Sequence, residues 1–566
     1  MNSNKSSARY LKEILKIHRV KDVVICPGSR NAPLIIAFTS DPYFNTYTIV
    51  DERSASFFAL GISQKTRNTV AIICTSGSAL INIGPAVAEA YYQRLPLLVI
   101  SADRPVEWVN QGESQTFDQH GVFRNFVRAS FDLVQEPTDA ESIHFQNRQI
   151  NEAINKTRFP DFGPVHINVR FREPLYDVDS GEMDDPIILK QSKVKAELDP
   201  TELEELQASW NKYERIVILC GMSNPDPELN AILNQLSSLG ITVLTESTSN
   251  LHSESFFPCI DRVIMPASHE EKQALKPELV ISIGGPVISR RIKSFFREYG
   301  LTENWRVDLL EYFQDAFMHQ TKAIAMNASQ FLVHFTTLPK KDLAFQRCWS
   351  DLDTRSDARQ TEFLEKADYS DLTSFAFLHR NIPEHSHIHV ANSSPIRYVQ
   401  LFRPDFQRNY FANRGTSGIE GSLSTAVGYS LHHRDKTFVI AGDLSTLYDS
   451  NALWNNYLHP NLKIIVLNNG GGGIFRIIPG PKTVKGFEKL IEARHEMNFN
   501  KLAELFNLTY FYASDQNSLE SRWSDFLNED QKAALLEIDT RSCENELVLM
   551  DYFNYLQNPK QQDGQS

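Results

Sequence analysis

One pattern recurs along the 566 residues: a short apolar run rich in Val and Ile, then turn residues, then a helix-like stretch. The runs are continuously apolar and do not alternate with polar positions, which is typical of parallel strands covered by helices on both faces. The predicted strands form three groups: 22–26, 70–74, 95–100 and 164–169; 215–221, 241–246 and 279–285; 387–392, 437–443, 462–469 and 533–539. The pattern predicts an α/β protein with doubly wound parallel sheets.

Two polar stretches separate these groups of strands. Residues 178–204 are charged and contain proline, and residues 336–345 combine proline with adjacent lysines. Such segments are typical of linkers, and a chain of this length is too long for one hydrophobic core. We therefore expect three α/β domains, at residues 1–180, 190–338 and 345–566.

The composition excludes several classes of protein. The formal net charge of −13 disfavours nucleic acid as a partner. The sequence contains no run of eighteen or more apolar residues, so we expect no membrane-spanning helix. The N-terminus lacks the apolar core of a secretory signal. The six cysteines are scattered without a CxxC pair, which disfavours a disulfide framework or a zinc site built on cysteine pairs. We expect a cytoplasmic protein.

Two polar residues follow neighbouring predicted strands near the C-terminus. Asp443 ends one apolar run and Asn469 ends the next, 26 positions later, before the glycines 470–473. The carboxyl ends of strands in an open α/β sheet form its ligand crevice. Carboxylate, amide and backbone carbonyl oxygens suit Mg²⁺, and glycines let the main chain approach a diphosphate. A helix-capping aspartate and a plain Asn-Gly turn are the alternative for either segment alone.

Arginines stand in loops directly after predicted strands. The planar guanidinium binds carboxylates in bidentate fashion, so converging arginines would indicate substrates with several carboxylates. Each one singly is more often a surface residue or an ion-pair partner. The six are Arg30, Arg104, Arg290, Arg291, Arg397 and Arg414.

The spacing of Asp443 and Asn469 resembles the diphosphate-anchoring motif of thiamine-diphosphate enzymes, GDG followed by NN. Leu444 replaces the second glycine, and GDLS is associated with one branch of that superfamily. The chain as a whole resembles the 2-succinyl-5-enolpyruvyl-6-hydroxy-3-cyclohexene-1-carboxylate synthase family. The matching segments are PGSR, DERSASF, TSGSALIN, SADRP, NQGESQTFDQHGVF, ANSSPIR, NRGTSGIEG, GDLSTLYD and NNGGGGIF. In the middle domain only SRR matches, and Arg290 stands where the family has a lysine.

This resemblance implies an activity and its cofactors. The family decarboxylates 2-oxoglutarate on thiamine diphosphate and adds the succinyl carbanion equivalent to isochorismate by conjugate addition, a step of menaquinone biosynthesis. It implies Mg²⁺, which Mn²⁺ can replace, three doubly wound domains, and a homodimer or homotetramer, because the first and third domains usually meet across subunits. An acid in the first domain contacts the aminopyrimidine of the cofactor.

The resemblance also assigns residues, position by position. The metal ligands would be Asp443, Asn469 and the carbonyl of Gly471, and the catalytic acid would be Glu52. Other cofactor contacts would be Thr75, Ser76, Gly77, Ser393, Ile419, Gly442, Leu444, Ser445 and Gly470. Substrate contacts would be Ser29, Arg30, Arg104, Gln115, Arg290, Arg291, Ser393, Arg397, Arg414, Ile474 and Phe475.

Several alternatives stay open at this point. Asp51 and Glu52 could be a plain helix N-terminus, where acids are favourable, and Ile419, Ile474 and Phe475 could be ordinary core residues. The chain could be another thiamine-diphosphate decarboxylase or carboligase resembling acetohydroxyacid synthase, which would need fewer arginines. A non-catalytic scaffold relative would be expected to lose Glu52 or Asp443, and both are present. The middle domain matches GxGxxG poorly, so we expect no flavin or NAD.

Overall fold

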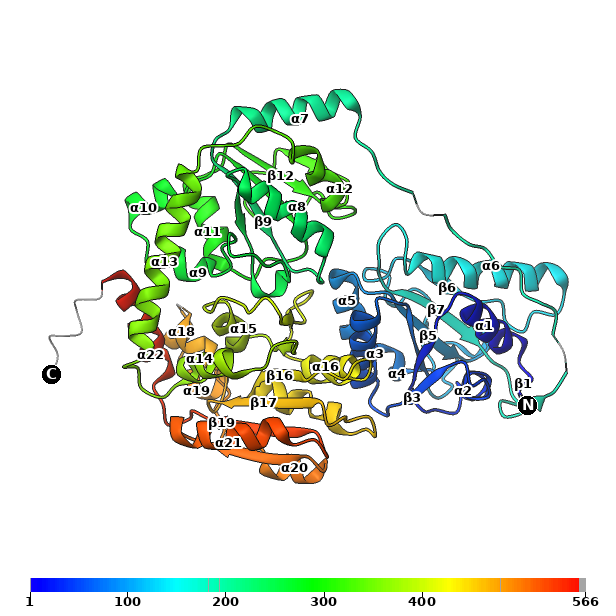
Figure 1. Cartoon of the computed structure of the whole chain (residues 1–566). Coiled ribbons are helices and arrows are strands. Elements are labelled where there is room, and N and C mark those ends of the chain that lie inside the picture. Colours follow the sequence, from blue (N-terminus) through cyan, green and yellow to red (C-terminus); the bar gives the residue numbers. More distant parts are fainter. Residues whose placement is uncertain (1, 182, 193, 479, 559–566) are drawn as a thin grey trace.

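A computed structural model describes residues 2–181, 183–192, 194–478 and 480–558. The chain forms three parallel sheets, each in its own α/β unit, and the middle unit sits above the other two in Figure 1. This confirms the predicted fold class of doubly wound parallel sheets. Within the described residues, no helix is both long enough and apolar enough to cross a bilayer.

The N-terminal sheet has six parallel strands in the order β3-β2-β4-β5-β7-β6. Its central strands β4 and β5 are fully buried and rich in Val, Ile and Leu, because helices cover both faces. The strands are β2 Asp22–Ile25, β3 Asn45–Thr48, β4 Val70–Cys74, β5 Leu97–Asp103, β6 Ser130–Asp132 and β7 Val165–Arg170. The helices are α1 Ser6–Ile17, α2 Ala32–Thr39, α3 Glu52–Thr66, α4 Ser78–Asn82, α5 Gly84–Gln93, η1 Val106–Trp108 and α6 Ala140–Lys156.

The middle sheet has five parallel strands in the order β10-β9-β11-β12-β13. It is reached by the long connection that runs to α7 in Figure 1, after the short antiparallel pair β1 Asn2–Ser3 and β8 Val178–Asp179. The strands are β9 Ile216–Cys220, β10 Thr242–Leu244, β11 Leu279–Ile283, β12 Glu303–Val307 and β13 Lys322–Ile324. The helices are α7 Pro200–Lys212, α8 Pro227–Ser238, η2 Ser247–Ser249, α9 Ile260–Ile264, α10 His269–Ala274, α11 Arg290–Tyr299, α12 Ala328–Leu332 and η3 Val333–Phe335.

The C-terminal sheet has the order β15-β14-β16-β17-β19-β18, which is the order of the N-terminal sheet taken strand for strand. The strands are β14 His387–Val390, β15 Asn409–Phe411, β16 Thr437–Gly442, β17 Leu462–Asn468, β18 Thr509–Ala513 and β19 Ala534–Asp539. The helices are α13 Ala344–Leu364, α14 Asp371–Asn381, α15 Ser394–Val399, α16 Ser422–Ser430, α17 Asp443–Tyr448, η4 Ser450–Leu453, α18 Ile474–Ile477, η5 Pro481–Thr483, α19 Phe487–Leu490, α20 Asn500–Leu505, α21 Gln516–Asn528 and α22 Asn545–Gln557.

Helices α3 and α16 join the first and third units. A Cβ added to Gly61 would lie 1.9 Å from the Thr425 carbonyl oxygen, and one added to Gly428 would lie 2.0 Å from the Phe58 carbonyl oxygen. The two backbones therefore touch at glycines, where any larger residue would push the helices apart. One hydrophobic core continues from the N-terminal sheet through these helices to the C-terminal sheet. This packing fixes α3, which begins at Glu52, against the unit that carries Asp443.

Candidate functional site

Asp443 and Asn469 follow two paired strands of the C-terminal sheet, β16 and β17. Asp443 is only 2% exposed. Its Oδ2 accepts hydrogen bonds from the backbone N–H groups of Gly470, at 2.7 Å, and Gly471, at 2.9 Å. Its Oδ1 accepts one from the N–H of Leu444 at 2.6 Å. The structure therefore brings the two predicted strand tips together around one buried carboxylate.

The amide of Asn469 is held in one orientation by Asp371. The Asn469 Nδ2 donates to Asp371 Oδ2 at 3.0 Å, while Asn469 Oδ1 is buried and has no hydrogen-bond partner among the described residues. Asp371, the first residue of α14, also accepts from Thr540 Oγ1 at 2.6 Å. Burial raises the pKa of Asp371, and the nearby charge of Asp443 adds to that rise. Sequence reasoning missed Asp371, because it opens a helix far from any recognised motif.

These strand tips fit a magnesium ion and a diphosphate. A buried carboxylate and an unpaired amide oxygen are hard ligands, and a buried polar atom without a partner otherwise costs free energy. The backbone is open at Gly442, where an added Cβ would meet no atom within 4 Å of the described structure. Gly470 and Gly471 have φ of +81° and +150°, which residues with a side chain rarely adopt. The Gly471 carbonyl, the third predicted ligand, accepts from the N–H of Gly473 at 2.9 Å.

His495 is a second neighbour of the carboxylate that sequence reasoning missed. Its Nε2 lies 3.4 Å from Asp443 Oδ2, and its backbone N–H donates to the Gly470 carbonyl at 3.0 Å. The segment around it also covers the glycine loop, since the Gly472 N–H donates to the Glu492 carbonyl at 2.6 Å. A polar cavity of about 160 Å³ lies beside this loop and is lined by Asn469, Gly473 and Arg476, among others.

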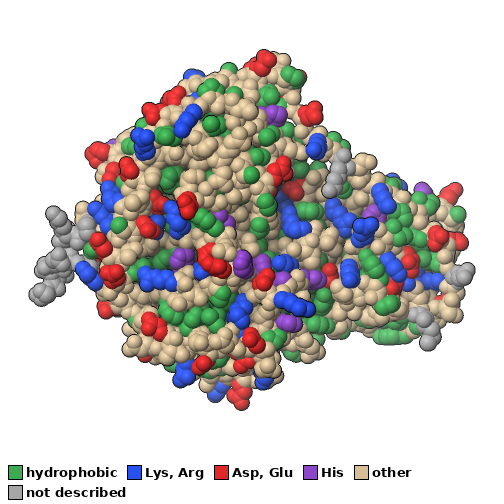
Figure 2. Space-filling view, in the orientation of Figure 1, with side chains coloured by type: hydrophobic (Ala, Val, Ile, Leu, Met, Phe, Trp, Pro, Cys, Tyr) green, Lys and Arg blue, Asp and Glu red, His purple; other side chains and the backbone are tan. Residues whose placement is uncertain are grey.

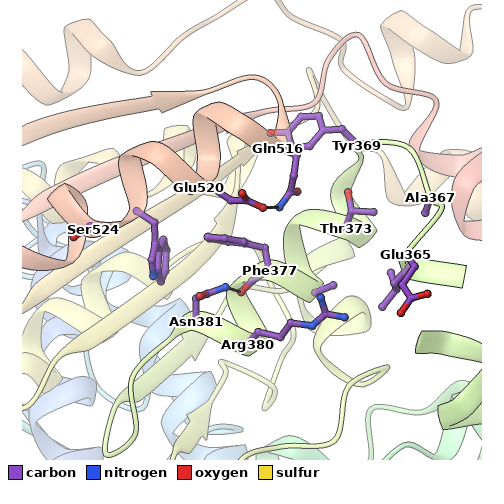
Figure 3. Close-up of a pocket in the computed structure, with 13 residues that line it drawn as sticks. Glu365, Ala367, Tyr369, Thr373, Phe377, Arg380, Asn381, Gln516, Glu520 and Ser524 are labelled. Atoms are coloured by element: carbon purple, nitrogen blue, oxygen red, sulfur yellow. Dashed lines mark hydrogen bonds between the residues drawn. The ribbon is translucent and has the colours of Figure 1, made fainter. Parts of the chain in front are cut away.

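A larger cavity of the same unit lies elsewhere. It measures about 590 Å³ and opens between α13, α14 and α21, around Phe377 and Arg380 (Figure 3). One pair of its polar side chains is hydrogen-bonded: Gln516 Nε2 donates to Glu520 Oε1 at 2.6 Å (Figure 3). Among the described residues that line it, none belongs to the predicted site.

Asp51 and Glu52 have different positions at the start of α3. Asp51 is the N-cap: its Oδ1 accepts from the N–H groups of Arg53, at 2.9 Å, and Ser54, at 3.3 Å. Its Oδ2 accepts from Asn451 Nδ2 at 2.7 Å. Burial, and after it the charge of Glu52, raises the pKa of Cys74, the last residue of β4, so the Glu52 carboxylate lies near that strand end. The helix-capping role thus belongs to Asp51, and Glu52 is the first residue of the helix that Asp51 caps.

The Thr75-Ser76-Gly77 turn lies in the same crevice. A Cβ added to Gly28 would lie 2.4 Å from Thr75 Cβ, and one added to Gly77, whose φ is +83°, would lie 3.2 Å from Gln115 Cα. The hydroxyls of Thr75 and Ser76 are buried without a partner in the part of the chain that the structure describes. Predicted cofactor and substrate contacts of this unit therefore gather at the tips of β2 and β4, together with the exposed Ser29.

The predicted arginines form two groups in the chain. In the first, burial and then the charge of Arg104 lower the pKa of Arg30, which pairs with Glu173 at 3.1 Å. Arg104 donates from Nε to the Ser114 carbonyl at 2.7 Å. No hydrogen bond or ion pair between described residues joins this group to the second.

The second group lies where the middle and C-terminal units meet. Burial lowers the pKa of Arg397, and the charges of Arg290, Arg414 and Arg291 lower it further. Arg414 donates from Nη1 to Asn392 Oδ1 at 2.8 Å, at the carboxyl end of β14. Four of the six arginines thus lie near enough for the charges of three of them to lower the pKa of Arg397, while the charge of Asp261 opposes this lowering. Such a site suits an anion with several carboxylates.

The remaining predicted residues lie around the C-terminal crevice. Ser393 is the N-cap residue directly before α15 and has φ of +76°, a strained conformation for a residue with a side chain. Ile419 is 36% exposed, which disfavours ordinary core packing, and its carbonyl accepts from Ser445 Oγ at 2.6 Å. Ile474 is 8% exposed, so core packing stays open for it, and Phe475 contacts the backbone at Gly472.

Comparison with known proteins identifies the family. Models of thiamine pyrophosphate enzyme domains match residues 5–122 (N-terminal TPP binding domain), 188–387 (middle domain) and 393–538 (C-terminal TPP binding domain). The 2-succinyl-5-enolpyruvyl-6-hydroxy-3-cyclohexene-1-carboxylate synthase of Christiangramia forsetii is 39% identical over 558 residues, covering 95% of this chain and 96% of its own. The enzymes of that name from Flavobacterium johnsoniae and Porphyromonas gingivalis are 40% and 37% identical, over 97% and 98% of this chain and 98% of each relative.

The chain belongs to this synthase family. It is a thiamine-diphosphate-dependent enzyme, as the sequence predicted, and the relatives support the synthase over an acetohydroxyacid-synthase-like enzyme. The two TPP-binding matches cover the crevices described above: Glu52 falls in the N-terminal match, and Asp443 and Asn469 fall in the C-terminal one.

Proposed function

We propose that this member of the synthase family decarboxylates 2-oxoglutarate and adds the succinyl unit to isochorismate by conjugate addition, a step of menaquinone biosynthesis. Both substrates are dicarboxylates, and the two arginine groups supply charge for both. The observation that carries the proposal is the buried Asp443 carboxylate at the strand tips, beside the unpaired Oδ1 of Asn469.

We propose that Asp443, Asn469 and the Gly471 carbonyl bind Mg²⁺, which Mn²⁺ can replace. Of these groups, the Asn469 Oδ1 is buried without a hydrogen-bond partner among the described residues, and the glycine backbone admits a diphosphate. Gly442, Leu444, Ser445 and Gly470 would contact that diphosphate. Asp371 accepts a hydrogen bond from the Asn469 amide nitrogen, which would leave the amide oxygen available to the ion.

Thiamine diphosphate, when bound, supplies the electron sink that a 2-oxo acid needs to lose CO₂. The chain's own contribution is to orient the cofactor and exchange a proton with it. Glu52 would hold a proton against the aminopyrimidine ring, next to Thr75, Ser76 and Gly77, whose turn carries two unpaired hydroxyls. Ile419, an exposed apolar side chain at the C-terminal crevice, would support the bent cofactor together with Ser393.

The substrates would be held by residues from all three units. Ser29, Arg30, Arg104 and Gln115 come from the first unit, and Arg290, Arg291, Ser393, Arg397 and Arg414 come from the other two. Ile474 and Phe475 would exclude water near the reacting carbon. In the low-dielectric crevice each guanidinium attracts a carboxylate more strongly than it would in water.

We further propose a homodimer or homotetramer in the cytoplasm. No hydrogen bond or ion pair between described residues joins the two arginine groups, and a second subunit would bring one group opposite the other. Val50 and Trp454, which line one cavity, are 49% and 53% exposed, as expected of residues that a partner covers. The six cysteines are free thiols, as in a reducing compartment.

The test is a product assay on protein stripped of cofactor and metal. With thiamine diphosphate and Mg²⁺ restored, 2-oxoglutarate and isochorismate together should give the synthase product and CO₂. Formation of the synthase product when both thiamine diphosphate and Mg²⁺ are left out would refute the cofactor assignment. Turnover of pyruvate to acetolactate, with no product from isochorismate, would establish the acetohydroxyacid-synthase-like alternative instead.

A further inference from the structure

Two histidines and an aspartate gather at the amino ends of two strands in the C-terminal sheet. His387 opens β14, and His433 and Asp435 lie in the turn between α16 and β16. One ligand atom from each lies within 4.8 Å of the others. His387 and Thr437 are paired in the register of β14 and β16, so the sheet fixes the backbone of the cluster. Figure 2 shows histidine side chains on the surface near the place of α16 in Figure 1.

Neighbouring hydroxyls leave one nitrogen of each ring available. The Tyr429 hydroxyl lies 3.0 Å from His387 Nδ1, so His387 Nε2 faces Asp435 Oδ2, at 3.8 Å. Thr437 Oγ1 lies 3.0 Å from His433 Nε2, and His433 Nδ1 is buried without a hydrogen-bond partner in the described chain. Metal-binding histidines have this arrangement: the second ring nitrogen contacts an outer group that fixes the tautomer and the ring orientation.

We propose that His387 Nε2, His433 Nδ1 and Asp435 Oδ2 bind one divalent transition-metal ion, with Zn²⁺ the best match and water as the fourth ligand. Imidazole and carboxylate ligands suit Zn²⁺, and an ion with Zn–N bonds of about 2.0 Å needs ligand atoms roughly 3.3 Å apart. The side chain of Asp435 is 59% exposed, so its rotation can close the distance.

The protonation of the two rings agrees with this proposal. Burial lowers the pKa of His387 to about 4 and that of His433 to about 3. Both rings are therefore neutral near pH 7, which is the form that binds a metal. The cluster needs no proton release from either histidine before the ion binds.

This site is distinct from the proposed magnesium site. The cluster stands at the amino ends of β14 and β16, whereas Ser393 and Asp443 follow their carboxyl ends. The six residues of β16 span about 20 Å, so the bound ion takes no part in the chemistry. The ion would instead stabilise the turn between α16 and β16, next to α3 and α16, the two helices that join the first and third units.

A competing explanation is that Asp435 serves only Lys65 of α3. The Lys65 Nζ lies 5.3 Å from the centre of the Tyr429 ring, and the charge of Asp435 partly offsets the lowering of the Lys65 pKa by burial. The two explanations predict different metal affinities for the Lys65→Met variant. If the cluster binds a metal, removing the competing ammonium should tighten binding at least severalfold.

The experiment titrates Co²⁺ into chelator-treated full-length protein held in saturating Mg²⁺ and thiamine diphosphate. We expect one equivalent to produce the visible absorption of a tetrahedral Co²⁺ ion, and Zn²⁺ to displace it. His433→Gln and Asp435→Asn should each weaken binding at least tenfold. His432→Gln is the matched control, because His432 is adjacent but pairs with Asp22 at 3.4 Å, and it should bind as the wild type does.

Two results would overturn the proposal. One is a wild-type protein that gives no tetrahedral Co²⁺ absorption. The other is an affinity in Asp435→Asn equal to that of the wild type; this exposed position keeps the test valid if His433→Gln fails to fold. Synthase activity is measured in parallel on each variant and should be unchanged, because none of these residues lies at the cofactor crevice. A failure of the metal-site proposal can therefore be told apart from a failure of the proposed function.

Discussion

The contact between α3 and α16 makes Gly428→Ala a demanding test of how the first and third units are held together. A Cβ at Gly428 would lie 2.0 Å from the Phe58 carbonyl oxygen, and real Cβ atoms essentially never come within 3.0 Å of such an atom. The helices must therefore separate by about 1 Å. Overpacking of this kind costs about 1–3 kcal/mol, and the atoms that the added Cβ would meet belong to the backbone of Phe58 and cannot rotate away, so we expect the upper end.

Alanine also favours the helix over glycine by about 1 kcal/mol, which leaves a net loss of about 2 kcal/mol. Hydrogen–deuterium exchange of peptides that cover α3 and α16 measures this loss locally, where a global unfolding fit of a three-unit protein would not. A loss of about 2 kcal/mol corresponds to roughly 30-fold faster exchange. The matched control is Gly84→Ala in α5, where the added Cβ would lie 3.6 Å from Phe123, an ordinary contact. Wild-type exchange rates in Gly428→Ala would refute the close packing of these helices.

Four further predictions concern single residues. Glu52→Gln should lower turnover at least 100-fold with thiamine diphosphate binding retained, and near-normal turnover would remove Glu52 from catalysis. Arg397→Ala should raise the KM for a dicarboxylate substrate about tenfold or more; unchanged KM values for both substrates would exclude that contact. Asp371→Ala frees the Asn469 amide to rotate, so the Mg²⁺ concentration needed for half-maximal activity should rise about tenfold, with kcat at saturating Mg²⁺ nearly preserved. Burial lowers the pKa of His166 to about 3, below its unfolded value of 6.5, so its contribution to stability is complete above pH 6.5 and is lost as pH falls toward 3. Below pH 6.5, the slope with pH of the local opening free energy of β7, measured by hydrogen exchange, should decrease by about 1.4 kcal/mol per pH unit in His166→Gln, and an unchanged slope would contradict this.

The sequence predicted the buried strands and missed most edge strands. Runs such as the one that forms β4 are covered on both faces and are apolar throughout. The edge strands β3, β6 and β18 are half-exposed and carry polar or aromatic residues, so their pattern does not stand out. β12 is central but contains Arg306, whose charge is paired with Asp308 at 2.7 Å, a contact that no local pattern reveals.

The candidate site was predictable where residues follow strands. Asp443 and Asn469 are recognisable because the chain itself places them at neighbouring strand tips, and the spacing is characteristic. Asp371 and His495 reach the same point from a helix start and from a loop, so only the folded structure relates them to it. The pattern favoured Glu52 over Asp51 as the catalytic acid but left a plain helix N-terminus open for both, and the hydrogen bonds that engage Asp51 as a cap separate the two residues.

The central claim is that a metal ion bound by Asp443 and Asn469, at the carboxyl ends of β16 and β17, anchors the cofactor. Calorimetric titration of thiamine diphosphate into metal-free protein, with and without Mg²⁺, tests it most directly when wild type is compared with Asn469→Ala. The account predicts binding that requires Mg²⁺ in the wild type and falls at least 100-fold in the variant. Equal affinity of the two proteins, or wild-type binding that is indifferent to Mg²⁺, would contradict it.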